Sequence, residues 1–401
     1  MKRRAGEWRS RLLLAMVSTG LTLAAAEIGA RVLLRPTPSA PPDGTPISEL
    51  SPTLGWRTKA NGSQRIKRDD FEVTVSLNSL GLRGPEIPYE AAPGVRRLAI
   101  MGDSFAHGYY AEEPQTLRGR LGAALKPCQV DVLNAGGPGY STDQEWIYFI
   151  EEIRKYHPSE VVLLFYYNDL SFNIDRKGTA NRQKPMFLDK GGMLEVVLPD
   201  LERALPRNRE ERTLDRVRRV PTFHGSVLWS FAASRLQRTR PDWTRSLSDW
   251  GLAPSISGQP PTEYLPFGPA SDDERTDVEV MWRRTTAILQ RFRDDVRREG
   301  AGFTVFYVPA RFEANDEAWT FIRRRYTGDR AWNRDVVRTR LAATLTSLDI
   351  PLVEAGAAFQ AAEKSATPAY LSLDGHWNAR GNEIAFDSLL PTYRRAFSCG
   401  S

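Results

Sequence analysis

The chain has 401 residues, of which 41% are hydrophobic and 26% are charged. These fractions are close to those of globular proteins, so they exclude wholesale disorder, and the length fits two or three domains. The formal net charge is +6. Seven basic and two acidic residues fall within positions 1–35, a net +5, which leaves only +1 for the other 366 residues. Because those residues hold no RNP, helix-turn-helix or zinc-finger spacing, we expect no nucleic-acid partner.

The first 35 residues are predicted to form a membrane-targeting segment. Basic residues up to Arg11 precede an uncharged run, Leu12–Ala26. A cleaved signal peptide fits the basic start, the apolar run and its final alanines as a cleavage site. A retained single-pass anchor would run on through Glu27 and Arg31, which are spaced to pair on one helix face. Either interpretation predicts that the chain from residue 36 onward is periplasmic or extracellular. We favour the anchor, which predicts single-pass attachment to the cell membrane through this segment.

Composition divides the rest of the chain into two parts. Residues 36–50 are rich in Pro, Ser and Gly, which is typical of a semi-rigid linker, and the patterning up to residue 95 predicts a small β-rich segment. Residues 96–398 form the main predicted domain. An insertion at 176–270 interrupts it, with an arginine-rich stretch before an acidic one. We interpret that insertion as two solvated helical faces.

Apolar runs alternate with helical periodicity from Arg96 onward. Strands are predicted at 97–101, 130–133, 161–166, 303–308 and 350–353. Capping boxes at Thr142–Glu145 and Ser271–Glu274 predict two helix starts, and further helices are expected over about 114–125 and from about 381. This alternation predicts an α/β domain with a parallel sheet and helices on both of its faces.

The cysteine and histidine counts limit what else the chain can hold. Cys128 and Cys399 are the two cysteines. In an oxidising compartment they allow one disulfide, and a bridge and two separate buried thiols stay equally open. Four histidines and two cysteines without close spacing indicate no metal site, and we expect no cofactor.

Residues with catalytic chemistry follow four of the predicted strands. Ser104 follows the first, Gly139 the second, Asn168 the third, and Asp374 and His376 the last. Sites in open α/β sheets form at these carboxyl ends. A serine needs a base, usually histidine, and a carboxylate orients that base. We therefore expect Ser104 as nucleophile, His376 as base and Asp374 as orienting acid, with the Ser104 amide, Gly139 and Asn168 forming an oxyanion hole.

The other histidines fit the role of base less well. His107 lies one turn beyond Ser104 and is the alternative base, but no carboxylate is spaced to orient it. His157, beside Pro158, and His224, in the predicted insertion, are interpreted as structural.

These strand-end motifs resemble the blocks of the GDSL/SGNH hydrolase superfamily. In order, they are Gly102-Asp103-Ser104, Asn134…Gly139, Asn168-Asp169 and Asp374…His376. The resemblance covers about 96–175 and 271–398, and implies a three-layer α/β/α fold with a flavodoxin-like five-stranded sheet and the same catalytic roles. Two positions depart from the pattern. Tyr166 stands where the family has Gly, and Asp-x-His replaces Asp-x-x-His, a spacing similar to the alginate O-acetyltransferase-like branch.

The resemblance and the predicted location together imply a function class. We expect an extracytoplasmic serine esterase that hydrolyses acyl esters, O-acetyl esters above all, on a small molecule or a carbohydrate through an acyl-enzyme on Ser104. One alternative is an O-acyltransferase that moves acyl groups onto polysaccharide. Another is a non-catalytic binding protein on the same fold, with the insertion as its interface.

Overall fold

The computed structural model describes residues 2–33, 43–68, 70–178, 182–190, 193–201, 260–326, 330–372 and 374–399, together with positions 235 and 243. The chain divides into two compact units. The first comprises Met1–Pro41 and Arg207–Gly258, and the second comprises Pro42–Pro206 and Gln259–Ser401. Every element named below except α1 belongs to the second unit.

One long helix, α1 (Lys2–Leu33), contains the uncharged run of the N-terminal segment. Within the part of the chain that the structure describes, no helix meets the combined length and hydropathy that a membrane span needs. A helix at these positions is confirmed, but the expected membrane helix is not shown.

A five-stranded parallel sheet forms the centre of the second unit. Its strands are β6 (Arg96–Gly102), β7 (Val130–Gly136), β8 (Glu160–Phe165), β11 (Gly302–Tyr307) and β12 (Leu352–Glu354). Their order across the sheet is β12-β11-β8-β6-β7, the flavodoxin-like arrangement. Gly102 pairs in register with Gly136 on one side and Leu164 on the other, so three strands end at one level. The predicted parallel α/β sheet is confirmed.

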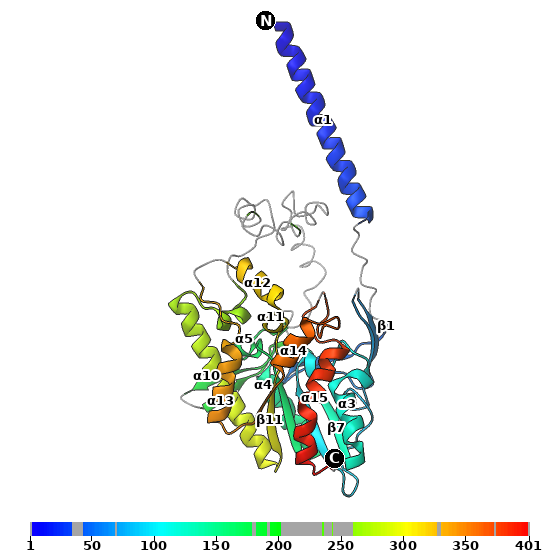
Figure 1. Ribbon diagram of the computed structural model, residues 1–401, viewed down its shortest axis with the longest axis vertical. Helices are drawn as coiled ribbons and strands as arrows, with labels where there is room; N and C mark the ends of the chain where they lie inside the picture. The colour runs from blue at the N-terminus through cyan, green and yellow to red at the C-terminus, as the bar shows by residue number, and fades with distance from the viewer. Residues whose placement is uncertain are drawn as a thin grey trace. The chain divides into compact units, whose positions relative to one another are not determined.

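Helices cover both faces of this sheet (Figure 1). One face packs against α4 (Thr142–Glu151), α10 (Asp272–Arg298) and α13 (Val336–Ser347). The other packs against α3 (Leu117–Leu125), α14 (Gly356–Glu363) and α15 (Ala379–Ala396). Successive residues of β6 alternate between the two cores, Leu98 and Ile100 in one and Ala99 and Met101 in the other. Burial on both faces explains why this strand is apolar throughout.

The start of α4 corrects one prediction. The predicted capping box at Thr142–Glu145 is wrong by one residue, because Ser141 is the N-cap and Gln144 completes the box. Ser141 and Gln144 form a Ser-x-x-Gln capping box. It overlaps the predicted box at Thr142–Glu145, one residue further along the chain. The predicted start of α10 is confirmed, since the Ser271 hydroxyl accepts a hydrogen bond from the Glu274 amide at 3.1 Å.

Residues 43–77, which we call the N-terminal β segment, precede the sheet. They contain a three-stranded antiparallel sheet with a small core of Ile47, Ile66, Val73, Val75 and Leu77, and a hairpin whose Leu54 and Trp56 pack into the larger core. The strands of the sheet are β1 (Asp43–Thr45), β4 (Ser63–Lys67) and β5 (Glu72–Ser76), and those of the hairpin are β2 (Ser48–Ser51) and β3 (Gly55–Thr58). The predicted β-rich character of this region is therefore observed.

The remaining elements are short. The helices are α2 (Ser104–His107), α5 (Asp169–Phe172), α11 (Arg311–Ala314) and α12 (Asp316–Arg325), with 3-10 turns at Glu113–Gln115, Lys126–Cys128, Ile153–Tyr156 and Thr262–Phe267. Within the predicted insertion, β9 (Met186–Lys190) and β10 (Met193–Val197) form an antiparallel hairpin. Most of its basic and acidic stretches, and His224, lie outside the described residues.

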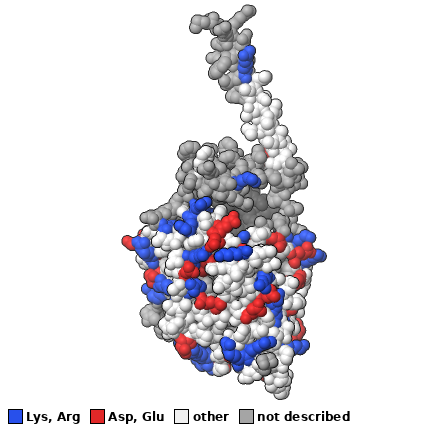
Figure 2. Space-filling model, viewed as in Figure 1, with Lys and Arg blue, Asp and Glu red and all other residues white. Residues whose placement is uncertain are grey.

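Charges of both signs are interleaved on the face shown in Figure 2. Among the described residues, ion pairs join Arg340 to Glu279 at 2.6 Å and Arg330 to Glu274 at 2.8 Å. This mixing agrees with the nearly neutral balance of the chain beyond residue 35.

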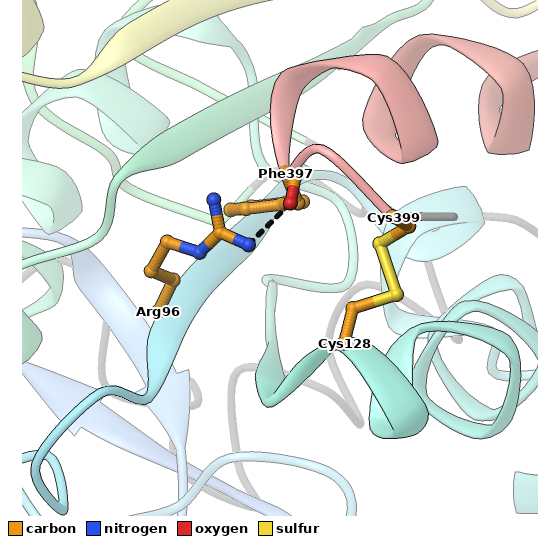
Figure 3. Close-up of a disulfide and its surroundings, with 4 residues drawn as sticks. All are labelled: Arg96, Cys128, Phe397 and Cys399. Atoms are coloured by element: carbon orange, nitrogen blue, oxygen red, sulfur yellow. Dashed lines mark hydrogen bonds between the residues drawn. A yellow bond between two sulfur atoms is a disulfide. The ribbon is translucent and has the colours of Figure 1, made fainter.

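A disulfide joins Cys128 to Cys399, whose Cα atoms lie 5.5 Å apart (Figure 3). It connects the turn after α3 with the segment that follows α15. Nearby, the Arg96 guanidinium lies 5.0 Å from the ring centroid of Phe397 and donates a hydrogen bond to the carbonyl of the same residue. Of the two alternatives left open by the sequence, the structure contains the bridge.

Candidate active site

The turn after β6 presents Ser104. Gly102 has φ +144°, and a Cβ there would lie 2.9 Å from the Leu164 Cβ, so the tight turn from strand to helix requires glycine. The Asp103 side chain caps α2 by accepting a hydrogen bond from the Phe105 amide at 2.8 Å. Ser104 is thereby the first residue of α2 and lines a cavity of about 480 Å³.

Ser104, His376 and Asp374 form one hydrogen-bonded series. The Ser104 Oγ lies 2.8 Å from His376 Nε2, although the two residues are 272 positions apart. Asp374 Oδ1 is hydrogen-bonded to His376 Nδ1 and also accepts the His376 amide at 3.1 Å. Burial raises the pKa of Asp374, but its hydrogen bonds with His376 and Tyr110 and the charge of His376 outweigh this and hold it below its usual range. A carboxylate on Nδ1 leaves Nε2 to accept the serine proton.

Two aromatic rings enclose the His376 imidazole. Phe105 stacks on it with ring centroids 4.7 Å apart, and Tyr110 stacks with centroids 4.2 Å apart. Tyr110 is also hydrogen-bonded to Asp374, and burial together with that carboxylate raises the pKa of the Tyr110 phenol. Both rings follow Ser104 closely in sequence. Sequence reasoning missed Tyr110, because no motif spacing distinguishes it from a surface tyrosine.

Gly139 and Asn168 line the same cavity as Ser104. Gly139 has φ +77°, a backbone conformation that favours glycine. The indole N–H of Trp56 donates to the carbonyl of Pro138 at 2.9 Å, and the Tyr140 hydroxyl donates to the carbonyl of Trp56 at 2.8 Å. Trp56 therefore fixes the residues on both sides of Gly139. It lies in β3, outside the region that the sequence assigned to the catalytic domain.

The walls of the catalytic cavity come from several segments. The N-terminal β segment contributes Pro46, Ile47, Ser48, Trp56, Arg57, Thr58 and Gln64. Four tyrosines add aromatic surface, namely Tyr109, Tyr110, Tyr140 and Tyr166. Tyr166, which replaces a family glycine, packs against Phe105 with ring centroids 4.7 Å apart. The N-terminal β segment is thus part of the site.

The structure does not support His107 as the base for Ser104. Its side chain is buried, it does not line the cavity, and neither ring nitrogen has a hydrogen-bond partner among the described residues. Burial, with the nearby Arg83, lowers the pKa of His107 well below its ordinary value. His157 caps the 3-10 turn Ile153–Tyr156 with φ +48°. Of the histidines that the structure describes, His376 is therefore the one that the fold brings to the serine.

Buried carboxyl groups surround the nucleophile turn. Burial raises the pKa of Asp103 to about 6, against the lowering effects of its backbone hydrogen bonds and of His376. Burial also raises the pKa values of Asp169 and Glu145 well above their usual range, and the charge of Asp103 adds to the rise of both. Sequence reasoning missed this cluster, because the three acids are far apart in the chain and share no motif.

Part of this chain is similar in sequence to a known protein family. Residues 269–398 match the family described as the SGNH hydrolase-like domain of acetyltransferase AlgX. The match covers about a third of the chain, and this stretch is similar to the SGNH hydrolase-like domain of that family. The resemblance stated from the motifs, including its AlgX-like branch, is therefore confirmed.

Similar solved structures are distant in sequence. They include a catalytic mutant of the acetylxylan esterase Axe2 from Geobacillus stearothermophilus, at 13% identity over 77% of this chain and 96% of that chain, with a TM-score of 0.35. A putative acylhydrolase from Bacteroides fragilis has 12% identity over 78% and 92%, with a TM-score of 0.35. The lipase/acylhydrolase from Enterococcus faecalis has 12% identity over 75% and 96%, with a TM-score of 0.37. No curated protein matches this chain in sequence.

Proposed function

We propose that the protein is a serine esterase that hydrolyses short acyl esters, acetyl esters above all, carried by a carbohydrate. The observation that carries this proposal is the series from Ser104 Oγ through His376 to Asp374, with 2.8 Å between the serine oxygen and Nε2. A serine hydroxyl becomes a competent nucleophile when a positioned base removes its proton. The series opens into a cavity large enough for an acylated sugar.

The first half-reaction forms an acyl-enzyme. Ser104 Oγ attacks the ester carbonyl carbon while its proton passes to His376 Nε2, and the Asp374 carboxylate stabilises the imidazolium that results. The carbonyl oxygen becomes an oxyanion that the Ser104 and Gly139 amides and the Asn168 side chain would receive. Collapse of this intermediate breaks the bond to the alcohol oxygen, which takes the proton from His376.

The second half-reaction releases the acyl group. Water gives a proton to His376 Nε2 and attacks the acyl carbon, and the same oxyanion donors act again. Collapse breaks the bond to Ser104 Oγ, which recovers its proton from His376. The carboxylic acid leaves, and every group of the chain returns to its starting state.

A second candidate is O-acyl transfer, in which a sugar hydroxyl replaces water in the second half-reaction. The match of residues 269–398 to a family described as an acetyltransferase favours it, as does the Asp-x-His spacing. Acceptor competition separates the two activities. Capture of the acyl group by added polysaccharide, at the expense of free acid, supports transfer, whereas undiminished hydrolysis without capture excludes it.

We also propose that the catalytic domain works outside the cytoplasm. Basic residues precede the uncharged run Leu12–Ala26, and such an arrangement directs the following chain across a membrane. The Cys128–Cys399 disulfide is of the kind that persists in oxidising compartments. An alkaline-phosphatase fusion after residue 399 should be active in intact cells, and an inactive fusion would contradict export.

Labelling with a fluorophosphonate tests the esterase proposal directly. The reagent forms a stable adduct with activated serines, so we expect one adduct on Ser104 and none in the Ser104→Ala variant. The His376→Ala variant should label far more slowly, because the base is missing. Folded wild-type protein that takes up no label on Ser104 would refute the nucleophile assignment.

A further inference from the structure

A second cavity lies next to the catalytic one. Both have a volume of about 480 Å³, and Arg57 and Thr58 of β3 line both of them. The second cavity is bounded by the β2–β3 hairpin and by the last turn of α4, which contributes Tyr148 and Glu151. It contains neither Ser104 nor His376. A strand shared between the two cavities places them close enough for one extended molecule to occupy both.

The lining of the second cavity defines the chemistry of its ligand. Hydroxyl groups dominate, from Ser51, Thr53, Thr58, Ser79, Tyr89 and Tyr148. Three carboxylates line it, Glu49, Glu151 and Glu152. Arg57 is ion-paired with Glu49 at 2.7 Å and Lys155 with Glu152 at 2.8 Å, which leaves the charge of Glu151 in excess. The Thr53, Ser79 and Tyr89 hydroxyls already donate to carboxylates of the protein. Their oxygens can still accept from the hydroxyls of a ligand, which matches a polyhydroxyl ligand. The excess of carboxylates disfavours a polyanion.

Hydrogen bonds hold this cavity in shape. The Thr53 hydroxyl donates to Glu151 at 2.8 Å, which ties the β2–β3 turn to α4. The Gln144 side chain donates to the carbonyl of Leu54 at 2.8 Å, and the Leu54 amide donates to the Ser51 hydroxyl at 3.2 Å. These contacts hold the cavity in shape before a ligand binds. Binding therefore costs little conformational entropy of the protein.

We propose that the second cavity binds an uncharged sugar unit of a glycan whose neighbouring acylated unit occupies the catalytic cavity. The inference rests on the proposed esterase function and names its substrate as a neutral oligosaccharide. Contacts to a part of the substrate that does not react supply binding energy without touching the chemistry. A small ester such as p-nitrophenyl acetate occupies only the catalytic cavity. Its turnover therefore does not depend on the second cavity.

Filling the second cavity tests the proposal. Ala60 lines it and is exposed, so Ala60→Trp adds an indole there with little demand on the fold. Leu80→Trp fills it from another side and serves as the second variant. Ala361→Trp, on the exposed side of α14, is the matched control. The substrates are p-nitrophenyl acetate, acetylated xylose and acetylated xylotetraose.

For the wild-type protein we expect kcat/KM to be about tenfold or more higher for acetylated xylotetraose than for acetylated xylose, with the difference in KM. Ala60→Trp and Leu80→Trp should abolish that preference and leave p-nitrophenyl acetate turnover unchanged, and Ala361→Trp should leave all three rates unchanged. A wild-type protein without length preference, or a preference that survives both cavity-filling variants, overturns the proposal.

A binding measurement separates this proposal from the esterase proposal. Calorimetry with unacetylated xylotetraose and the Ser104→Ala variant needs no turnover. We expect binding that Ala60→Trp weakens by about fivefold or more when it is introduced into the same variant. Binding that is absent, or unchanged by the indole, overturns the sugar site even if Ser104 is an active nucleophile. Binding that is lost on filling supports it even if no ester is hydrolysed.

Discussion

The ring of Tyr110 stacks on the ring of His376, with centroids 4.2 Å apart and planes inclined by 27°. The same tyrosine is hydrogen-bonded to Asp374. One side chain therefore contacts both the base and the acid that orients it. Because Asp374 and His376 are separated only by Gly375, whose surroundings are open, this contact from another segment fixes the geometry of a short loop.

Tyr110→Phe should lower kcat for p-nitrophenyl acetate by about tenfold, because a hydrogen bond to a charged group is worth about 1.5–3 kcal/mol. KM should stay the same, since the ring remains. In the wild type this hydrogen bond helps to hold the pKa of Asp374 below its usual range, so its loss should raise the pKa of that carboxyl. Tyr156→Phe is the control, because its buried hydroxyl has no partner among the described residues. Equal effects of the two variants would contradict the positioning role.

The two buried or half-buried histidines near the nucleophile should respond differently to substitution. His376→Ala should reduce p-nitrophenyl acetate turnover by about 10²–10⁴-fold, because it removes the general base. His107→Ala should largely spare turnover and lower the melting temperature, because it empties a buried site. Paired kinetics and thermal denaturation check both outcomes, and the reverse pattern would reassign the base.

Asp103 should make stability depend on pH. Its pKa rises from 3.8 to about 6 on folding, so the folded state holds the proton more tightly than the unfolded chain. The contribution of Asp103 to stability is therefore complete below pH 3.8 and is lost as pH rises through about 6, by about 3 kcal/mol. Asp103→Asn keeps a capping oxygen and should remove this loss.

Urea denaturation at pH 4 and pH 8 measures the Asp103 effect. The free energy of unfolding should fall less between the two pH values in Asp103→Asn than in the wild type. Asp272→Asn is a suitable control, because this carboxylate lies in the exposed first turn of α10. Parallel curves for wild type and Asp103→Asn would show that Asp103 does not carry the dependence.

Removal of the disulfide should destabilise the second unit. Cys128→Ser with Cys399→Ser opens a covalent loop that spans 271 positions, and the loss of such a bridge typically costs about 2–5 kcal/mol. Urea denaturation with and without dithiothreitol measures this. The reductant should lower the wild type to the level of the double variant and leave the variant unchanged. A wild type insensitive to reductant would contradict a stabilising bridge.

Trp56→Phe should slow catalysis from outside the catalytic domain. The substitution keeps an aromatic ring and removes the 2.9 Å hydrogen bond to Pro138, which helps to fix Gly139. We expect kcat to fall by about fivefold to tenfold, as the loss of one hydrogen bond implies. Trp319→Phe, which packs on Phe312 in α11, is the control. An unchanged kcat in Trp56→Phe would separate the N-terminal β segment from the chemistry.

Local patterns explain what could be predicted and what could not. Apolar runs identify β6, β7, β8 and β11 because each strand is buried on both faces, and Ser104, Gly139, Asn168, Asp374 and His376 stand out because each follows a strand. Trp56 and Tyr110 depend on packing between distant segments, which no local spacing reports. The α4 cap was misplaced because Ser141 and Thr142 both begin acceptable boxes.

The 272 positions between Ser104 and His376 also set the order in which the chain acquires its chemistry. A nascent chain holds the serine, both flanking rings and the turn around Gly139 long before the imidazole is synthesised. Until then the serine has no proton acceptor and is as inert as any alcohol. Reactivity toward esters thus arises at the last stage of synthesis, when the Asp374–His376 loop and α15 join a sheet whose earlier strands are already made.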